Sequence, residues 1–174
     1  MVTSSEILDH VHQLRRYARL LCGNAVDADD LVQSTLEKAV RHTGRFREGQ
    51  DLRVWLFAIL HNTFISSIRE SRSRRDRETS WFESGASVVS GAQEVSAELS
   101  RVLAAISDLP TQQREVLLLV SVEGFSTEEI AYTMDIPVGT VRSRLARGRE
   151  MLRRMLEQGT TVHPLTVVGG HDAR

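Results

Sequence analysis

The segment 126–156 limits most narrowly what this chain can fold into, because it predicts two helices joined by a tight turn. Ser126 and Glu129 have the spacing of a capping box, in which each side chain bonds to an unpaired backbone N–H of the other residue. Pro137 suits the first turn of a second helix, where its missing N–H would have no partner. The segment is therefore predicted to form a helix-turn-helix unit.

The second helix of this unit has two different faces. Small and aliphatic residues at helical spacing form one stripe, namely Val141, Leu145, Gly148, Leu152 and Met155. Residues 138–156 also hold six arginines against one glutamate, a net charge of +5. One guanidinium group can donate two hydrogen bonds to a guanine edge or a phosphate, so this pattern is typical of a helix that reads a DNA major groove. The alternative is a solvated basic helix at a protein interface.

The composition narrows the class of function. The 174 residues carry a net charge of −1, so charge alone does not predict tight DNA binding, and a partner is expected to support it. The single cysteine, Cys22, rules out a disulfide framework and is expected to be a small core residue. The six histidines show no metal-ligand spacing, and the sequence shows no recognisable set of catalytic residues. We therefore expect no metal site, no cofactor and no enzymatic activity.

The helical periodicity predicts an all-α fold made of two small domains, 1–76 and 95–157. Between them, residues 77–94 are rich in serine, glycine and alanine without helical period, which indicates a flexible linker. Residues 158–174 are expected to be a loose tail. No long apolar run or signal-peptide pattern is present, so a cytoplasmic protein without membrane insertion of its own is expected.

Three helices are predicted in the first domain. One apolar stripe runs through Ile7, Val11, Leu14, Ala18 and Leu21 and ends at Gly23. A second, acid-rich helix is expected to begin at Asp27. A third is expected from about Asp51 to Arg75, apolar nearly all round and with Trp55 in the core. Its one polar stripe consists of Asn62, Ser66 and Arg69.

Several motifs, in this order, make the chain resemble the extracytoplasmic-function group of sigma-70-type sigma factors. The resemblance covers about residues 14–156 and includes a sigma-2-like bundle followed by a sigma-4-like helix-turn-helix domain. The motifs that carry it are residues 14–24, 27–33, 46–49, 52–62, 107–117 and 126–156. It implies an initiation factor that gives core RNA polymerase its promoter specificity.

By this resemblance, the second helix binds the clamp helices of the polymerase beta-prime subunit, and the sigma-4-like domain binds the beta flap. The implied polymerase-binding residues are Asp27, Asp29, Asp30 and Gln33. Clustered carboxylates at an exposed helix start suit a basic partner surface, although helix capping alone would account for Asp27. Ser34 departs from the family pattern, in which an acidic residue commonly follows the glutamine.

The third helix is similar to the element that melts and holds the minus-ten promoter strand. An unstacked base needs a pocket and hydrogen bonds to its edge, and the Asn62 amide offers both a donor and an acceptor. Bridging within the bundle is the alternative role of Asn62. The implied minus-ten residues are Phe46, Arg47, Asn62, Ser66, Arg69, Arg72 and Arg74.

The helix-turn-helix is similar to the unit that reads the minus-thirty-five element. The implied residues are Thr140, Arg142, Ser143, Arg144, Ala146, Arg147 and Arg149. Thr140 and Arg144 suit phosphate contacts better than base reading. Ala146 is smaller than the residue common in the family, which implies a different base preference.

The implied partners are core RNA polymerase, promoter DNA and an anti-sigma factor. A membrane-bound anti-sigma factor would hold the protein at the membrane. Two alternatives remain open from the sequence. One is a helix-turn-helix regulator that works without polymerase, and the other is a sigma mimic that titrates an anti-sigma factor. The arginines of 142–154 and 69–77 argue against the mimic.

Overall fold

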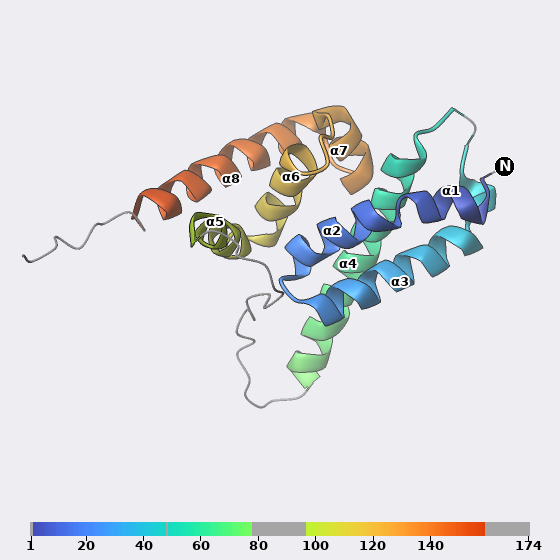
Figure 1. Ribbon diagram of the computed structural model, residues 1–174, viewed down its shortest axis with the longest axis horizontal. Helices are drawn as coiled ribbons and strands as arrows, with labels where there is room; N and C mark the ends of the chain where they lie inside the picture. Colours follow the sequence, from blue (N-terminus) through green and yellow to red (C-terminus); the bar gives the residue numbers. More distant parts are fainter. Residues whose placement is uncertain (1, 48, 78–96, 159–174) are drawn as a thin grey trace, which may run out of the picture.

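The computed structural model describes residues 2–47, 49–77 and 97–158, with the side chains of 72–77 and 158 outside that description. Within these ranges every regular element is helical, as Figure 1 shows, so the all-α prediction is confirmed. The elements are α1 (Ser4–Asp9), α2 (Val11–Cys22), α3 (Ala25–Arg41), the short 3₁₀ helix η1 (Thr43–Arg45), α4 (Leu52–Arg77), α5 (Ala97–Ser107), α6 (Thr111–Ser121), α7 (Thr127–Met134) and α8 (Val138–Gln158). The predicted linker and tail lie almost entirely outside the described residues.

The predicted helix-turn-helix is formed by α7 and α8. Ser126 N donates to Glu129 Oε2 at 2.7 Å, and Glu129 N donates to Ser126 Oγ at 3.1 Å, so the capping box closes as expected. Asp135 ends α7 in the left-handed region, with φ of 51°. The Pro137 carbonyl then accepts from Thr140 N at 2.8 Å, which opens α8.

Two predicted helix boundaries were wrong. The first predicted helix is two helices, because the chain turns at His10 between α1 and α2 while the apolar stripe continues across the break. The second helix begins at Ala25 and not at Asp27, since Asn24 is its cap: Asn24 Oδ1 accepts from Asp27 N at 2.8 Å. Asp27 therefore sits in the first turn, where its charge favours the helix dipole.

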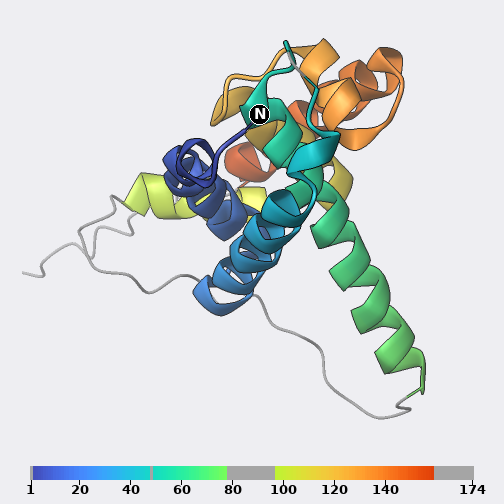
Figure 2. The same ribbon diagram turned by 90° about the vertical axis from the view of Figure 1, so that its right-hand side faces the viewer.

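The two predicted domains pack against each other across one continuous apolar core. Helices α2, α3 and α4 bury residues such as Leu14, Leu31 and Leu60, and α6, α7 and α8 bury residues such as Leu118 and Val141. Helix α4 packs on α7, and α2 packs on α6, as Figures 1 and 2 show. The C-terminal half of α4 projects beyond the helices around it (Figure 2).

Candidate nucleic-acid and polymerase surfaces

Helix α8 is positioned by its apolar stripe. Val141 and Leu145 are buried, and a Cβ added at Gly148 would lie 3.3 Å from the Cβ of Gln113 in α6. Glycine thus lets α8 approach α6 closely. On the outer side, Thr140, Ser143 and Arg144 are half-buried and four predicted DNA-contacting residues are exposed: Arg142, Ala146, Arg147 and Arg149.

The charges along α8 differ between its two ends. At the C-terminal end, Arg153 Nη2 lies 3.0 Å and Arg154 Nε 2.7 Å from Glu150 Oε1, so the glutamate offsets both cations. At the N-terminal end, Arg142 forms only a looser pair with Glu128 at 3.5 Å, and both side chains are exposed. Exposed pairs contribute little stability and exchange readily for another anion. The N-terminal half of α8 is therefore the half suited to a polyanion.

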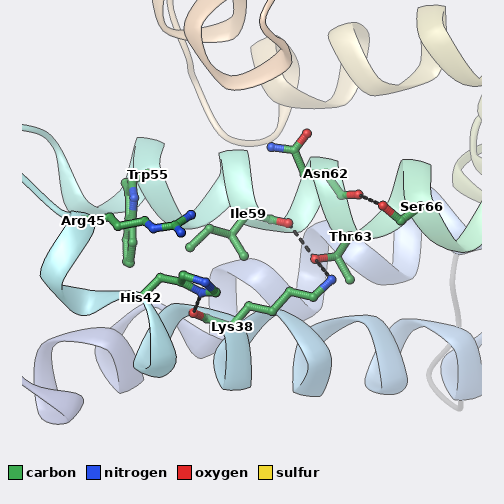
Figure 3. Close-up of a pocket in the computed structure, with 8 residues that line it drawn as sticks. All are labelled: Lys38, His42, Arg45, Trp55, Ile59, Asn62, Thr63 and Ser66. Atoms are coloured by element: carbon green, nitrogen blue, oxygen red, sulfur yellow. Dashed lines mark hydrogen bonds between the residues drawn. The ribbon is translucent and has the colours of Figure 1, made fainter.

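The polar stripe of α4 borders a pocket of about 270 Å³ that Figure 3 shows. Asn62 and Ser66 are exposed, and the Asn62 backbone carbonyl accepts from Ser66 Oγ at 2.8 Å. The pocket is lined by Lys38, His42, Arg45, Trp55, Ile59, Asn62, Thr63 and Ser66. It combines one aromatic ring, one amide and two permanent cations, which are the groups that hold an unstacked base and its phosphates.

Three of these pocket residues were not predicted from the sequence. Lys38 is the only lysine of the chain, and its Nζ donates to Thr63 Oγ1 at 3.2 Å across the pocket floor (Figure 3). His42 lies at the end of α3 and hydrogen-bonds through Nδ1 to the Lys38 carbonyl at 2.8 Å. Arg45 follows in η1. Only the packing of α3 on α4 brings them to Asn62, so no local pattern marks them.

The predicted loop residues Phe46 and Arg47 are not among the residues that line the pocket with Asn62. Phe46 packs edge-on against Trp55, with ring centroids 5.5 Å apart, while the neighbouring Arg45 lines the pocket. Trp55 is buried, as predicted for a core residue, yet it also lines the pocket. Arg47 is exposed beyond the pocket lining, and Arg69 is exposed further along α4. The side chains of Arg72 and Arg74 lie outside the described residues.

The acidic surface on α3 is exposed at all four predicted positions. Asp29 pairs with Arg15 of α2 at 3.2 Å, and Gln33 Nε2 donates to Glu37 at 3.1 Å. Asp27 accepts from Asn24 Nδ2 at 2.8 Å, while Asp30 borders an open groove next to α4. The surface thus presents carboxylates and an amide side by side on the outer face of one helix.

None of the described helices is both long and apolar enough to cross a membrane. Among the described residues, no group of three or more histidine, cysteine or acidic side chains is arranged to hold a metal ion.

A helical bundle followed by a helix-turn-helix is the arrangement expected of a sigma-70-type factor, and comparisons with known proteins agree. Residues 7–61 match the family model for the sigma-2 domain of PhyR, and residues 99–152 match the model for sigma-70 region 4. The ECF RNA polymerase sigma factor EcfG of Rhodopseudomonas palustris (strain TIE-1) is 40% identical over 152 residues, which cover 87% of this chain and 83% of EcfG. SigL, an ECF sigma factor of Mycobacterium tuberculosis, is 35% identical over 153 residues and covers 86% of each chain.

Solved structures give the same assignment. The sigma factor RpoE of Bartonella quintana, in complex with the anti-sigma factor NepR, superimposes with a TM-score of 0.76 at 36% identity, covering 88% of this chain and 95% of RpoE. CnrH, in complex with the cytosolic domain of CnrY, has a TM-score of 0.64 at 28% identity, covering 87% and 85%. The chain therefore belongs to the ECF RNA polymerase sigma factors, which are transcription initiation factors and not enzymes.

Proposed function

We propose that the chain directs promoter-specific initiation by binding core RNA polymerase through α3 and promoter DNA through α4 and α8. The observation that carries the proposal is that the Asn62 pocket and the α8 arginines are exposed on two separate helices of one chain. Each surface is small and would bind DNA weakly by itself. Polymerase would fix their spacing, so that binding at one raises the effective concentration at the other.

At the downstream contact, the pocket beside α4 receives an unstacked base of the minus-ten element. Asn62 supplies a hydrogen-bond donor and an acceptor to the base edge. Lys38 and Arg45 supply positive charge next to the same opening, which suits the flanking phosphates. Ser66 and Arg69 continue the polar stripe along α4.

At the upstream contact, α8 enters the major groove of the minus-thirty-five element. Arg142 and Arg147 are exposed near the N-terminal end, where they reach base edges. Thr140 and the helix start suit a phosphate, since the first backbone N–H groups of a helix attract anions. Arg149 and Arg144 flank this face and add phosphate contacts.

Run-off transcription with purified core polymerase tests this function. The chain is added to core polymerase on a library of promoter fragments, and the specific transcripts are measured. We expect transcripts that depend on both the chain and the polymerase. Promoter binding by the chain alone, with no polymerase association, would instead identify a regulator that acts without polymerase.

We further propose an anti-sigma partner, because the matched structure of RpoE contains the anti-sigma factor NepR and that of CnrH contains the cytosolic domain of CnrY. A sigma mimic is the second candidate, since the first half of the chain matches the sigma-2 domain of PhyR. The PhyR–NepR complex of Sphingomonas sp. Fr1 shares the fold, with a TM-score of 0.66 at 22% identity. A mimic needs no DNA-reading face, so the exposed arginines of α8 favour the initiation factor. Run-off transcripts would exclude the mimic.

A further inference from the structure

The contact between the two halves of the chain brings buried carboxylates to basic groups. Glu123, which is 4% exposed, accepts from Arg16 of α2 through Oε1, at 3.3 Å from Nε and 2.9 Å from Nη2. Glu115 of α6 is fully buried, and its Oε1 lies 2.7 Å from His61 Nδ1 in α4. The His61 ring nitrogen is therefore within hydrogen-bonding distance of the Glu115 carboxylate.

An aromatic ring completes the same contact. Phe125 is 3% exposed, and its ring centroid lies 5.1 Å from that of Phe57 in α4. The guanidinium carbon of Arg53 lies 4.4 Å above the Phe125 centroid. We define the α2–α4 surface as Arg16, Arg53, Phe57 and His61. This surface contacts two carboxylates and one ring from the segment 115–125.

Stability alone does not account for these carboxylates. The second oxygen of each, Oε2, is buried and has no hydrogen-bond partner among the described residues. A buried charge with unmet hydrogen bonds is costly, and apolar residues of similar size often pack such a contact at least as well. Their presence is explained if the surface that receives them binds another ligand of similar chemistry.

We propose that the α2–α4 surface binds single-stranded DNA, and that the segment 115–125 occupies it as an internal mimic. Guanidinium and imidazole groups bind phosphate oxygens as they bind carboxylate oxygens. The Phe125 ring lies under the Arg53 guanidinium, at 58° to the Phe57 ring, and there it occupies the place of an unstacked base. The carboxylates of Glu115 and Glu123 thus stand for phosphates, and Phe125 stands for a base.

The surface and the pocket lie on different faces of α4, because the side chains of the consecutive residues His61 and Asn62 point roughly 100° apart around the helix. A strand held at Asn62 would reach the surface by passing around α4, and to this extent the inference rests on the proposed function. Elements centred at minus ten and minus thirty-five are separated by about 85 Å at 3.4 Å per base pair. A globular chain of this length has a radius of gyration of only about 16 Å. Contact with both elements therefore requires the halves to separate, which uncovers the surface.

Fluorescence anisotropy of the full chain with a labelled dT12 oligonucleotide, without polymerase, tests the proposal. The double variant Glu115→Gln and Glu123→Gln keeps the side-chain shape and removes both charges. We expect its affinity for dT12 to rise at least fivefold over the unmodified chain. The slope of log affinity against log salt should steepen by about 1.4, because each single-strand phosphate contact contributes about 0.7. Small-angle X-ray scattering of both proteins reports whether the halves separate.

Arg16→Glu is the discriminating control. It repels Glu123 and opens the same contact, but it removes a phosphate-binding group, so no gain in affinity is expected. Arg19→Ala, at an exposed arginine of the same helix, combined with the double variant should keep most of the gain. Arg53→Ala combined with the double variant should lose it.

Equal gains from Arg16→Glu and from the double variant would overturn the proposal, and so would unchanged dT12 binding by the double variant. If the double variant does not fold, Glu123→Gln alone should steepen the slope by about 0.7. These readouts need no polymerase. Failure of run-off transcription would leave them intact, and transcription could succeed while they fail, so the two proposals are separable.

Discussion

At the scale of single residues, Cys22 illustrates how burial sets reactivity. Burial, with a smaller contribution from the Asp27 charge, raises the pKa of the Cys22 thiol to about 12. The thiolate is the reactive form, and its fraction at pH 8 should be about a thousandfold lower than for an ordinary thiol, so the native thiol should react much more slowly. Timed labelling with a chromogenic disulfide measures this, and the unfolded chain in denaturant is the control. Native labelling at the unfolded rate would contradict the assignment.

Residue-level prediction from sequence succeeded where the signal is local. The predicted capping box Ser126–Glu129 forms, because it joins residues three positions apart. Glu115 shows the opposite case. A glutamate within a helix ordinarily indicates a solvent-exposed face, and its burial arises from α4, which supplies His61 from 54 residues away. No local pattern predicts that contact.

At the scale of elements, the approach of α8 to α6 depends on Gly148. Isoleucine there would drive its branches into the Gln113 side chain and backbone. We expect Gly148→Ile to lower the free energy of unfolding by about 1–3 kcal/mol, as overpacking does. The matched control is Gly139→Ala in the same helix, where nothing lies within 4 Å and stability should rise by about 0.5 kcal/mol. Chemical denaturation measures both, and an unchanged stability of Gly148→Ile would show that α6 moves aside.

The proposed division of work between α3 and α8 predicts opposite defects. Arg147→Ala should reduce transcription from specific promoters at least tenfold, since a good base contact is worth about 1–3 kcal/mol, and leave polymerase binding intact. Asp30→Ala and Gln33→Ala should weaken polymerase binding itself. Co-purification with core polymerase, beside run-off transcription, separates the two effects. Loss of both activities in Arg147→Ala would assign α8 another role.

At the scale of the whole molecule, Tyr17 reports on the packing of the two halves. Burial raises the pKa of Tyr17 well above 10, and the nearby charges of Glu115 and Glu123 raise it further. The unfolded phenol ionises near pH 10. The neutral Tyr17 therefore contributes stability that is complete below about pH 10 and is lost as the pH rises toward the folded pKa.

The melting temperature should accordingly fall steeply above pH 10, and less steeply in Tyr17→Phe, which cannot ionise. Tyr132→Phe is the matched control, because that tyrosine is 56% exposed and lies outside the buried core. Calorimetry between pH 8 and 11 makes the comparison. Equal slopes for the two variants would show that Tyr17 ionises without cost in the folded protein.

The arrangement of the whole molecule was only partly predictable. Periodicity indicated the helices and their order, and the functional surfaces that the family resemblance implies on α3, α4 and α8 stay a prediction. The packing of α2 on α6 and of α4 on α7 was not predicted, since it depends on complementary shapes far apart in sequence. For the same reason the sequence did not predict that Lys38, His42 and Arg45 line the pocket.

The pairing of Arg16 with Glu123 spans 107 positions of the chain, and this has a consequence during synthesis. At about 5–20 residues per second, a ribosome needs roughly 5–20 seconds to advance from one residue to the other. For the later part of that interval, after residue 57 has been made, the N-terminal half carries Arg53 and Phe57 before Phe125 exists to cover them. The contact between the two halves can form only after residue 125 has been made.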